Sequence, residues 1–358
     1  MRLAWLEIRD FRNHEETRLE VPPGLVVAVG DNAQGKTNLL EAAHYLSSLG
    51  SPRVSSDQPL VRAGADSAFL RGEVETASGK ALVEIEVRST GANKVRVNGS
   101  GIRRKRDLRQ RVRSVMFIPE DLAIVQGEPE DRRRFLDQAT ESLWPVAEAA
   151  RQSYERALRQ RNRLLKEHEG PSAPPGLDAW DVELVTHGSA VTAGRGRAME
   201  RTAPRASGAY QAVAGMPLMV AYRASVEGPD LEDAFRAALA ERREDEIVRR
   251  RTLVGPHRDD LDLGVGGLAA RRFASHGESW AAALCLRLGL AEALAEEIEE
   301  PSLLLLDDPF SGLDPGRRRR LGQVLAARGQ VLLAVPDRAQ VPDGASVWEV
   351  EGGSVRPA

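Results

Sequence analysis

The stretch that decides the fold is Gly30-Asp31-Asn32-Ala33-Gln34-Gly35-Lys36-Thr37. It matches the phosphate-loop pattern G-x-x-x-x-G-K-[ST] at every fixed position. The apolar run Leu25 to Val29 precedes it, and a helical-looking stretch from Thr37 to Leu49 follows it. The motif therefore has the strand, loop and helix that it requires, which disfavours a glycine-rich turn that fits the pattern by accident.

The residue types in this loop suit a triphosphate. Gly30 and Gly35 permit backbone angles that turn successive N–H groups toward the phosphates, at the positive end of the following helix. Lys36 supplies a mobile positive charge, and Thr37 supplies a hydroxyl for Mg²⁺. We therefore predict that the loop from Gly30 to Thr37 binds a nucleoside triphosphate together with Mg²⁺.

Composition indicates a folded protein without membrane segments. The chain has 358 residues, 42% of them hydrophobic, which is enough for one large or two ordinary domains. Its formal net charge of −3 means that a polyanion must be met by local basic patches. The single cysteine, Cys285, lies in an apolar helical stretch and is expected to be a buried thiol. Met1 to Asp10 lacks the apolar segment of a signal peptide, and no later stretch could span a bilayer, so we expect a cytoplasmic protein with no membrane partner.

Three zones of the chain differ in their apolar spacing. From Met1 to about Phe117 the spacing is mainly that of strands, and from Glu130 to about Arg251 it is helical, with a Pro/Gly-rich break at Gly170 to Gly176. From Leu261 onward strand and helix alternate again. We therefore predict an α/β domain split by an inserted helical lobe. The expected divisions are residues 1–118, 119–251 and 252–358.

A buried-looking strand far along the chain supplies an acidic partner for the loop. Leu303 to Leu306 are apolar and are followed by Asp307 and Asp308. At the carboxyl end of a parallel strand, Asp307 can hold Mg²⁺, directly or through water, and Asp308 can orient and deprotonate the attacking water. Alone, this pattern is as often an acidic turn after a strand, but Lys36 gives it a partner.

Two short motifs complete an order that is typical of one class of ATPase. Ser275-His276-Gly277-Glu278 precedes a long helical run, where a hydroxyl, a close backbone and a helix dipole suit a γ-phosphate. Ser311-Gly312-Leu313-Asp314 follows the acidic strand. Phosphate loop, Ser-x-Gly-Glu signature, acidic strand and Ser-x-Leu-Asp loop occur in the order that resembles the head domains of ABC-type ATPases. The resemblance implies an ATP-dependent homodimer in which Ser275, Gly277 and Glu278 contact the nucleotide held by the other subunit.

Four segments carry a wider resemblance. They are Phe11-Arg12-Asn13, Phe117 to Leu122 with Arg132 to Asp137, Gly255-Pro256-His257-Arg258-Asp259-Asp260-Leu261, and Leu306 to Asp314. Together they resemble the RecF family, bacterial recombination and gap-repair ATPases related to the SMC proteins. The resemblance implies that Arg12 reaches the bound phosphates and that Asn32 faces the γ-phosphate. It also implies that Gln126, before Gly127, senses Mg²⁺ and links the helical lobe to the site.

The same resemblance implies a function. It implies ATP-dependent binding to double-stranded or gapped DNA in recombinational repair, with RecO and RecR as partners in loading RecA recombinase. Catalysis would fall to Asp308, with Gln126 assisting. Two departures from the ABC pattern predict slow hydrolysis, because His276 replaces a usual glycine, and Pro336 and Asp337 stand where a switch histidine is usual.

Basic clusters are the candidates for DNA contact. Arg103, Arg104, Lys105 and Arg106 begin a dense run after the predicted turn Asn98-Gly99, and a second run lies at 317–320. Arginine suits bidentate contacts with phosphate oxygens. Aromatic residues, at 4%, are too few for base stacking as the main mode. A charge run is usually a solvated face, so both readings stay open, and any DNA is expected to be bound through the duplex backbone.

Several rival classes share part of this pattern. A generic SMC- or ABC-type head with another DNA-linked role shares all the motifs. A nucleotide-binding subunit of a transporter is disfavoured because Thr37 and Ser275 lie much farther apart than in such subunits. A true SMC protein would need longer heptads than the broken middle segment allows. A P-loop kinase would need the loop and a metal carboxylate, but neither the Ser275 nor the Ser311 motif.

Overall fold

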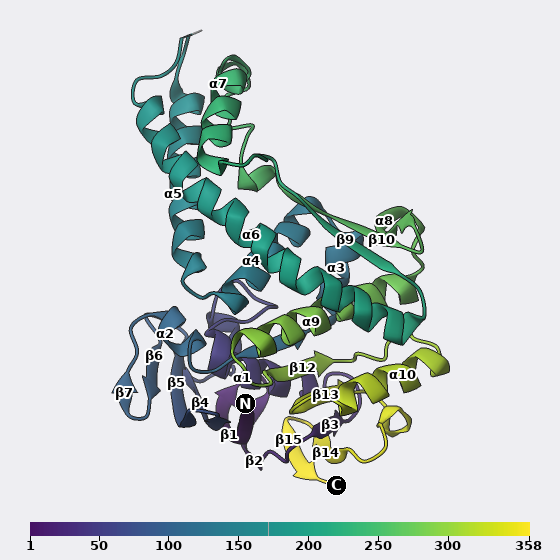
Figure 1. Ribbon diagram of the computed structural model, residues 1–358. Helices are drawn as coiled ribbons and strands as arrows, with labels where there is room; N and C mark the ends of the chain where they lie inside the picture. The colour runs from purple at the N-terminus through teal and green to yellow at the C-terminus, as the bar shows by residue number, and fades with distance from the viewer. Residues whose placement is uncertain (171) are drawn as a thin grey trace.

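The computed structural model describes residues 1–170 and 172–358. They form two six-stranded sheets, one three-stranded sheet and a helical lobe that rises above the sheets (Figure 1). The central sheet has the order β15-β14-β3-β13-β12-β8. Its strands are β3 (Leu25–Val29), β8 (Ser114–Phe117), β12 (Leu303–Asp307), β13 (Val331–Val335), β14 (Ser346–Glu351) and β15 (Ser354–Pro357).

The central sheet joins strands from the two ends of the chain. Strand β13 pairs in parallel with both β3 and β12, so that Leu333 lies opposite Val27 on one side and Leu306 on the other. Every residue of β12 and β13 is buried, as expected for parallel strands covered on both faces. Because parallel strands end at one edge, the loop after β3 and the carboxylates after β12 come together. The predicted α/β class is confirmed.

The second six-stranded sheet is antiparallel and has the order β2-β1-β4-β5-β6-β7. In β5, Ala81, Val83, Ile85 and Val87 are buried, whereas Glu84 and Glu86 between them are only partly covered, so one face lies on the core. The β6–β7 hairpin turns at Asn98 and Gly99, both with positive φ, as the sequence predicted. The strands are β1 (Arg2–Phe11), β2 (His14–Glu20), β4 (Ser67–Thr76), β5 (Gly79–Arg88), β6 (Lys94–Val97) and β7 (Ser100–Gly101).

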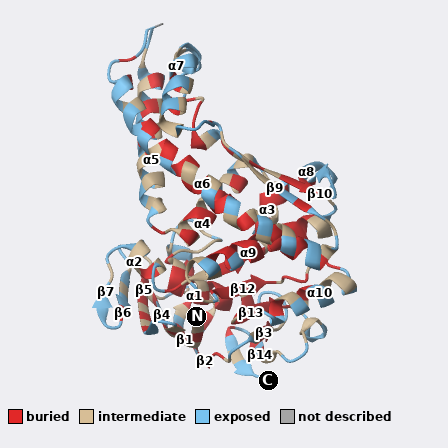
Figure 2. Ribbon diagram, viewed as in Figure 1, coloured by how far each residue is buried: buried red, intermediate tan, exposed pale blue. Residues whose placement is uncertain are grey.

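Two helices sandwich the central sheet. Helix α1 (Lys36–Ser48) shares one apolar cluster with both six-stranded sheets, and its Leu39 and Leu46 are almost fully buried. Helix α9 (His276–Glu297) covers the other face and is red along most of its length in Figure 2. Cys285 of α9 is fully buried, as predicted, and burial raises the pKa of its thiol to about 12.

The helical lobe consists of long helices with a small sheet at their side. Helix α6 runs from the cluster beside α9 to the tip of the lobe, where it packs with α5 and α7 (Figure 1). Of the break at 170–176, residue 171 lies outside the described residues. The lobe comprises α4 (Pro129–Leu143), α5 (Ala147–Glu167), α6 (Leu177–Ala214), α7 (Leu231–Arg249), β9 (Leu218–Arg223), β10 (Asp260–Val265) and β11 (Leu268–Ala269).

Strand β9 departs from the helical spacing predicted between Glu130 and Arg251. It pairs along its whole length with β10, and tertiary pairing of this kind overrides local spacing. The predicted divisions after residues 118 and 251 stay a prediction. In the part of the chain that the structure describes, no helix is long and apolar enough to cross a membrane. The remaining elements are α2 (Lys105–Arg109), α3 (Leu122–Gln126), α8 (Ala270–Phe273), α10 (Pro315–Ala326), η1 (Gln58–Leu60), η2 (Pro119–Asp121), η3 (Pro256–Arg258) and η4 (Arg338–Gln340).

Candidate nucleotide-binding site

The phosphate loop connects β3 to α1 and closes on itself through its lysine. Lys36 Nζ donates to the carbonyl oxygens of Gly30 and Asp31, both at 2.7 Å. Gly35 has a φ of 114°, and a Cβ there would crowd the amide of Asn13. A Cβ on Gly30 would meet the carbonyl oxygen of Val350. Both glycines are therefore required by the close packing of the loop.

The structure brings the loop and the acidic strand together. Thr37 Oγ1 donates to Asp307 Oδ2 at 2.8 Å, although the two residues lie at opposite ends of the chain. Burial raises the pKa of Asp307 to about 6, against the hydrogen bond from Thr37, and the charge of Asp308 adds to the rise. Burial also lowers the pKa of Lys36, which Asp307 and Asp308 oppose. The site is thus a desolvated cluster whose charges depend on one another.

Asp308 is held in a strained conformation. Its φ is 46°, a region that non-glycine residues seldom occupy and that costs on the order of 1–3 kcal/mol. Its Oδ1 is buried and has no hydrogen-bond partner among the described residues. Burial raises the pKa of this carboxyl, opposed first by a hydrogen bond from Ser311. A buried acceptor without a donor beside the loop fits a group that orients water.

The donors in this cluster also fit Mg²⁺. Thr37 and Asp307 offer a hydroxyl oxygen and a carboxylate oxygen already in contact, and hard oxygen donors are what Mg²⁺ prefers. Mg²⁺ usually keeps several waters and takes one or two protein ligands plus phosphate oxygens. Two adjoining protein oxygens at the start of α1 match that requirement.

Arg12 lies beside the loop, where a buried carboxylate holds it. Its Nε and Nη2 donate to the two oxygens of Glu41, both at 2.9 Å, and Glu41 is fully buried. Arg53 lies 3.6 Å from the same carboxylate, and Ser51 donates to it. Glu41, Ser51 and Arg53 were missed from the sequence. The available signal was a glutamate among the apolar positions of α1.

Of the residues predicted to contact a second nucleotide, Ser275 is exposed, and Gly277 and Glu278 are half-buried. Ser275 is the N-cap of α9 and forms a capping box with Glu278, whose N–H bonds Ser275 Oγ at 3.3 Å. Gly277 packs against the carbonyl of Gly312, which leaves no room for a Cβ. The signature therefore sits against the Ser-x-Leu-Asp loop. No hydrogen bond among the described residues joins it to the phosphate loop of its own chain.

Two further predicted residues are exposed. Asn32 lies at the open tip of the loop, with Asp31 and Ala33. Gln126 ends α3 and makes no hydrogen bond to the loop or to Asp307 among the described residues. Glu120 comes closer, because its carboxylate lies 4.0 Å from Arg53, which bonds Asn38 of α1. The structure thus joins the strand end at β8 to the site through Glu120, which the sequence analysis missed.

The Gly255 to Leu261 segment is a structural junction. Asp259 is buried, and it accepts from Arg195 and Tyr222 and from the backbone N–H of Ser225. Asp260 accepts two hydrogen bonds from Arg132 of α4. The segment therefore ties α4, α6 and β9 together. Its polar residues thus have a structural role in the helical lobe.

In the basic run after the β6–β7 hairpin, some side chains bond to other parts of the chain and others do not. Lys105 Nζ donates to the carbonyl of Leu49, and Arg109 donates to that of Ser48, at the end of α1. Arg103 and Arg104 are exposed, and no ion pair is formed by either among the described residues. Arg106 lies 3.8 Å from Asp107. Lys105 thus has a structural contact, whereas Arg103 and Arg104 stay free for a polyanion.

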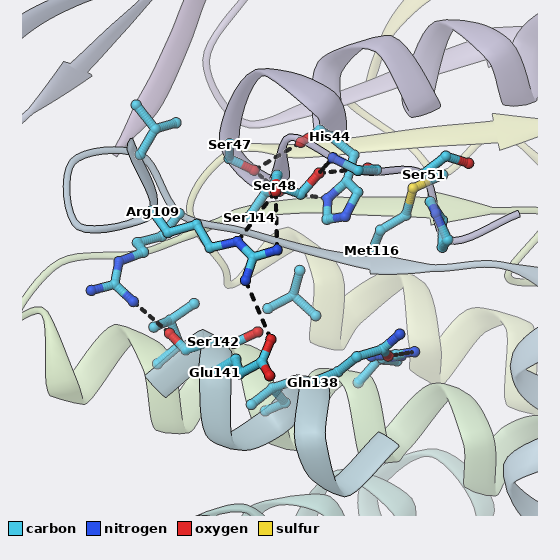
Figure 3. Close-up of a pocket in the computed structure, with 18 residues that line it drawn as sticks. His44, Ser47, Ser48, Ser51, Arg109, Ser114, Met116, Gln138, Glu141 and Ser142 are labelled. Carbon is cyan, nitrogen blue, oxygen red and sulfur yellow. Dashed lines mark hydrogen bonds and ion pairs between the residues drawn. The ribbon is translucent and has the colours of Figure 1, made fainter. Parts of the chain in front are cut away.

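Arg109 also lines a cavity between the central sheet with α1 on one side and the helices α4 and α9 on the other. The cavity has a volume of about 180 Å³ and is lined mainly by residues of α1, β8, α4 and α9. Figure 3 shows Arg109 reaching from Ser48 across to Glu141 of α4, with His44 and Ser114 paired on the same side as Ser48. Burial lowers the pKa of His44 to about 3. The end of α1 is thus bonded to the helical lobe through one guanidinium.

A phosphate loop after β3, an acidic strand two places along the sheet and a separate Ser-x-Gly-Glu helix start define an ABC-type ATPase head. The family described as the RecF/RecN/SMC N terminal domain matches residues 2–350. The Smc head bound to the C-winged helix domain of ScpA has the same fold, with a TM-score of 0.59, 14% identity and coverage of 100% of this chain and 97% of that one.

Within this class of ATPase heads, the chain is more similar to RecF proteins than to the Smc head. The DNA replication and repair protein RecF of Kineococcus radiotolerans is 40% identical over 388 residues, which covers 97% of this chain and 99% of that protein. The solved structure of the recombination mediator protein RecF-ATPrS in the RecFOR pathway matches with a TM-score of 0.89 and 28% identity, over 99% of this chain and 98% of that one. The chain belongs to the RecF family.

Proposed function

We propose that this protein is an ATP-dependent DNA-binding protein of recombinational repair that dimerises when ATP is bound. One observation carries the proposal: the phosphate loop and Asp307 meet through Thr37, whereas the Ser275 signature is exposed and separate. A composite site of this kind needs the signature of a second copy. The similar RecF structure is that of RecF-ATPrS, which supports ATP as the nucleotide.

The described side chains suit the tasks of such a site. Lys36 would exchange its contacts with loop carbonyls for phosphate oxygens, and Thr37 and Asp307 would hold the metal. Bound Mg²⁺ would supply charge neutralisation at the phosphates. Asp308 orients a water and accepts its proton at Oδ1, the carboxylate oxygen that has no donor among the described residues. Asn32 and Arg12 face the γ-phosphate in this proposal, and Gln126 retains the proposed Mg²⁺-sensing role only if α3 moves toward the loop.

Hydrolysis is proposed to be slow and to drive release from DNA. Asp308 is one methylene shorter than the glutamate that is common in ABC heads, and Pro336 and Asp337 offer no switch histidine. Each loss of about 1.4 kcal/mol in transition-state stabilisation slows turnover about tenfold. A long-lived ATP-bound dimer on DNA follows from these losses, and stimulation by DNA belongs to the same proposal.

Duplex or gapped DNA is the proposed polyanion, with Arg103 and Arg104 as the first contacts. Both lie on the exposed side of the basic run, whereas Lys105 and Arg106 have contacts within the chain. RecO and RecR are the proposed partners in loading RecA, because the similar RecF structure is placed in the RecFOR pathway. A role on chromosomal DNA would place the protein in the cytoplasm.

Mass in solution, measured with and without ATP and each with and without duplex DNA, tests the proposal. Wild-type protein should dimerise only with ATP. Lys36→Met should abolish dimerisation by losing the phosphate contact, and Ser275→Arg should block it while leaving ATP binding to the monomer intact. Mixing the two variants should restore one composite site and part of the ATPase activity. A monomer under all conditions would contradict the proposal, and a monomer that binds ATP but not DNA would favour a transporter-type or kinase-type role.

A further inference from the structure

Two turns from opposite ends of the chain clasp the back of the phosphate loop. One is the β1–β2 turn, which carries Asn13 and leads into His14, the first residue of β2, and the other is the β14–β15 turn at Gly353. The two turns also touch each other, because a Cβ on Gly353 would collide with the carbonyl of Asn13. None of the residues in these turns other than Arg12 and Asn13 belongs to a sequence motif of the site.

The clasp acts on two carbonyl groups of the loop. The carbonyl oxygen of Gln34 accepts from Asn13 Nδ2 at 3.0 Å and from the N–H of Gly353 at 2.9 Å. The carbonyl oxygen of Gly35 accepts from the N–H of Leu39 at 2.9 Å and lies 3.0 Å from His14 Nε2. In a planar trans peptide the C=O and the following N–H point in opposite directions. Holding both carbonyls at the back therefore aims the N–H groups of Gly35 and Lys36 at the phosphate side.

His14 occupies an unusual place in this clasp. Its side chain is fully buried, and both ring nitrogens face carbonyl oxygens. Nε2 lies 3.0 Å from the oxygen of Gly35, and Nδ1 lies 2.7 Å from the oxygen of Gly353. A neutral imidazole has one N–H and can donate to only one of these acceptors, whereas an imidazolium donates to both. Nδ1 also lies 3.3 Å from Thr17 Oγ1. In either neutral tautomer one ring nitrogen would turn a lone pair toward a carbonyl oxygen 2.7 or 3.0 Å away, so the geometry fits the protonated ring.

Burial of His14 disfavours the protonated ring, whereas the two facing carbonyl oxygens favour it. It lowers the pKa of His14, and the carbonyls of Gly35 and Gly353 oppose that effect. No charged side chain is among the causes of the shift. The charged groups on the surrounding elements are Arg2, Glu7, Arg9 and Asp10 on β1, Arg12 on the β1–β2 turn, Glu15, Glu16, Arg18 and Glu20 on β2, Asp31 in the loop, Lys36 and Glu41 on α1, Glu349 and Glu351 on β14 and Arg356 on β15. A bound polyphosphate would add several negative charges on the far side of the same peptide groups, and nearby negative charge favours the protonated ring.

We propose that His14 is a positioning residue of the phosphate loop that takes up a proton when nucleotide binds. The proposal rests on the proposed nucleotide function of the loop. The proton comes from solvent, and both ring nitrogens then donate, one to Gly35 and one to Gly353. A donor on the Gly35 oxygen polarises the peptide group that it shares with the Lys36 N–H, which becomes a stronger donor toward phosphate. Affinity for nucleotide should therefore fall as pH rises through the titration of His14 in the complex.

Calorimetric titration with the non-hydrolysable analogue AMP-PNP and Mg²⁺ tests this directly. The heat of binding is measured between pH 6 and pH 8 in two buffers of different ionisation enthalpy, which gives the number of protons taken up. Asp307 and the γ-phosphate also exchange protons, so the informative quantity is wild type minus variant. His14→Gln keeps a donor without a titrating group, and His14→Leu removes the donor. His187→Gln, at a partly exposed histidine paired with Glu183 on α6, is the control.

Wild type should take up more protons than His14→Gln, by about half a proton near the midpoint of the titration. His14→Gln should bind with an affinity that varies less with pH, and His14→Leu should bind about threefold to tenfold more weakly, since its loop carbonyl loses one buried donor. His187→Gln should match wild type. Equal proton uptake in wild type and His14→Gln would overturn the proposal. If Lys36→Met also bound AMP-PNP like wild type, the loop assignment itself would fail, whereas loss of binding in Lys36→Met alone would leave only the His14 role refuted.

Discussion

Replacing Glu41 with Gln tests whether the buried carboxylate on α1 sets the position of Arg12. The exposure of the two side chains is 0% for Glu41 and 15% for Arg12, and two hydrogen bonds of 2.9 Å join them. The substitution keeps the shape and one acceptor oxygen but removes the charge and the second acceptor. Arg12 and Arg53 then lie close together without a common counterion.

The magnitude follows from the contacts that are lost. A hydrogen bond to a charged group contributes about 1.5–3 kcal/mol, and breaking a buried ion pair by removing one partner costs about 3–5 kcal/mol. Because the amide oxygen still accepts one N–H, we expect Glu41→Gln to lower the free energy of unfolding by about 2–3 kcal/mol. We also expect weaker nucleotide binding, since Arg12 would no longer be held beside the loop.

Urea unfolding followed by circular dichroism measures the first effect, and titration with a fluorescent ATP analogue measures the second. The matched control is Glu232→Gln on α7, where the carboxylate bonds Arg236 at 2.7 Å but the two side chains are 47% and 56% exposed. A surface pair of this kind should change stability by less than about 0.5 kcal/mol. The reasoning fails if Glu41→Gln is as mild as the control in both assays.

Three more outcomes are expected. Asp308→Asn should keep ATP-driven dimerisation and DNA binding but dissociate more slowly than wild type in a DNA-release assay, and a wild-type turnover of many per second would argue for a motor instead. Neutralising Arg103 and Arg104 together should lower the slope of log affinity against log salt by about 2 on duplex DNA, and an unchanged slope would make this run a solvated face. Burial lowers the pKa of His257 to about 4, so the unfolded chain binds a proton first and stability should fall as pH drops from about 6.5 toward about 4. His257→Gln should remove up to about 3 kcal/mol of that dependence in urea unfolding at several pH values, and an unaltered dependence would contradict the cause.

The position of the phosphate loop between a strand and a helix was predictable because its motif lies in consecutive residues. Gly30, Gly35, Lys36 and Thr37 serve as close-packing positions, charge and hydroxyl at fixed spacing, and the flanking strand and helix follow local rules. Asp307 was predictable as its partner because a buried parallel strand carries a recognisable apolar run. In both cases the order along the chain determines the place in space.

What the sequence did not disclose depends on contacts between distant segments. The residues next to His14 in the sequence do not distinguish it from a core histidine. Its role depends on the carbonyl groups of Gly35 and Gly353, which lie on other elements. Glu41 likewise gains its role only when Arg12 is folded over it. The sequence also could not show which basic residues of the run bond to the rest of the chain. Lys105 and Arg109 do so because acceptors at the ends of α1 and α4 lie within their reach.

Helix α1 is gripped at both ends. The phosphate loop holds its first residue, and Lys105 and Arg109 hold the carbonyls of Leu49 and Ser48 at the other end. Its 13 residues make a stiff rod roughly 20 Å long that resists compression. In the proposed ATP-bound state Lys36 would leave the loop carbonyls for phosphate. An axial displacement of α1 would then be passed to Arg109, which also bonds Glu141 of α4. Helix α1 would thereby couple the phosphate loop at one end to the base of the helical lobe at the other.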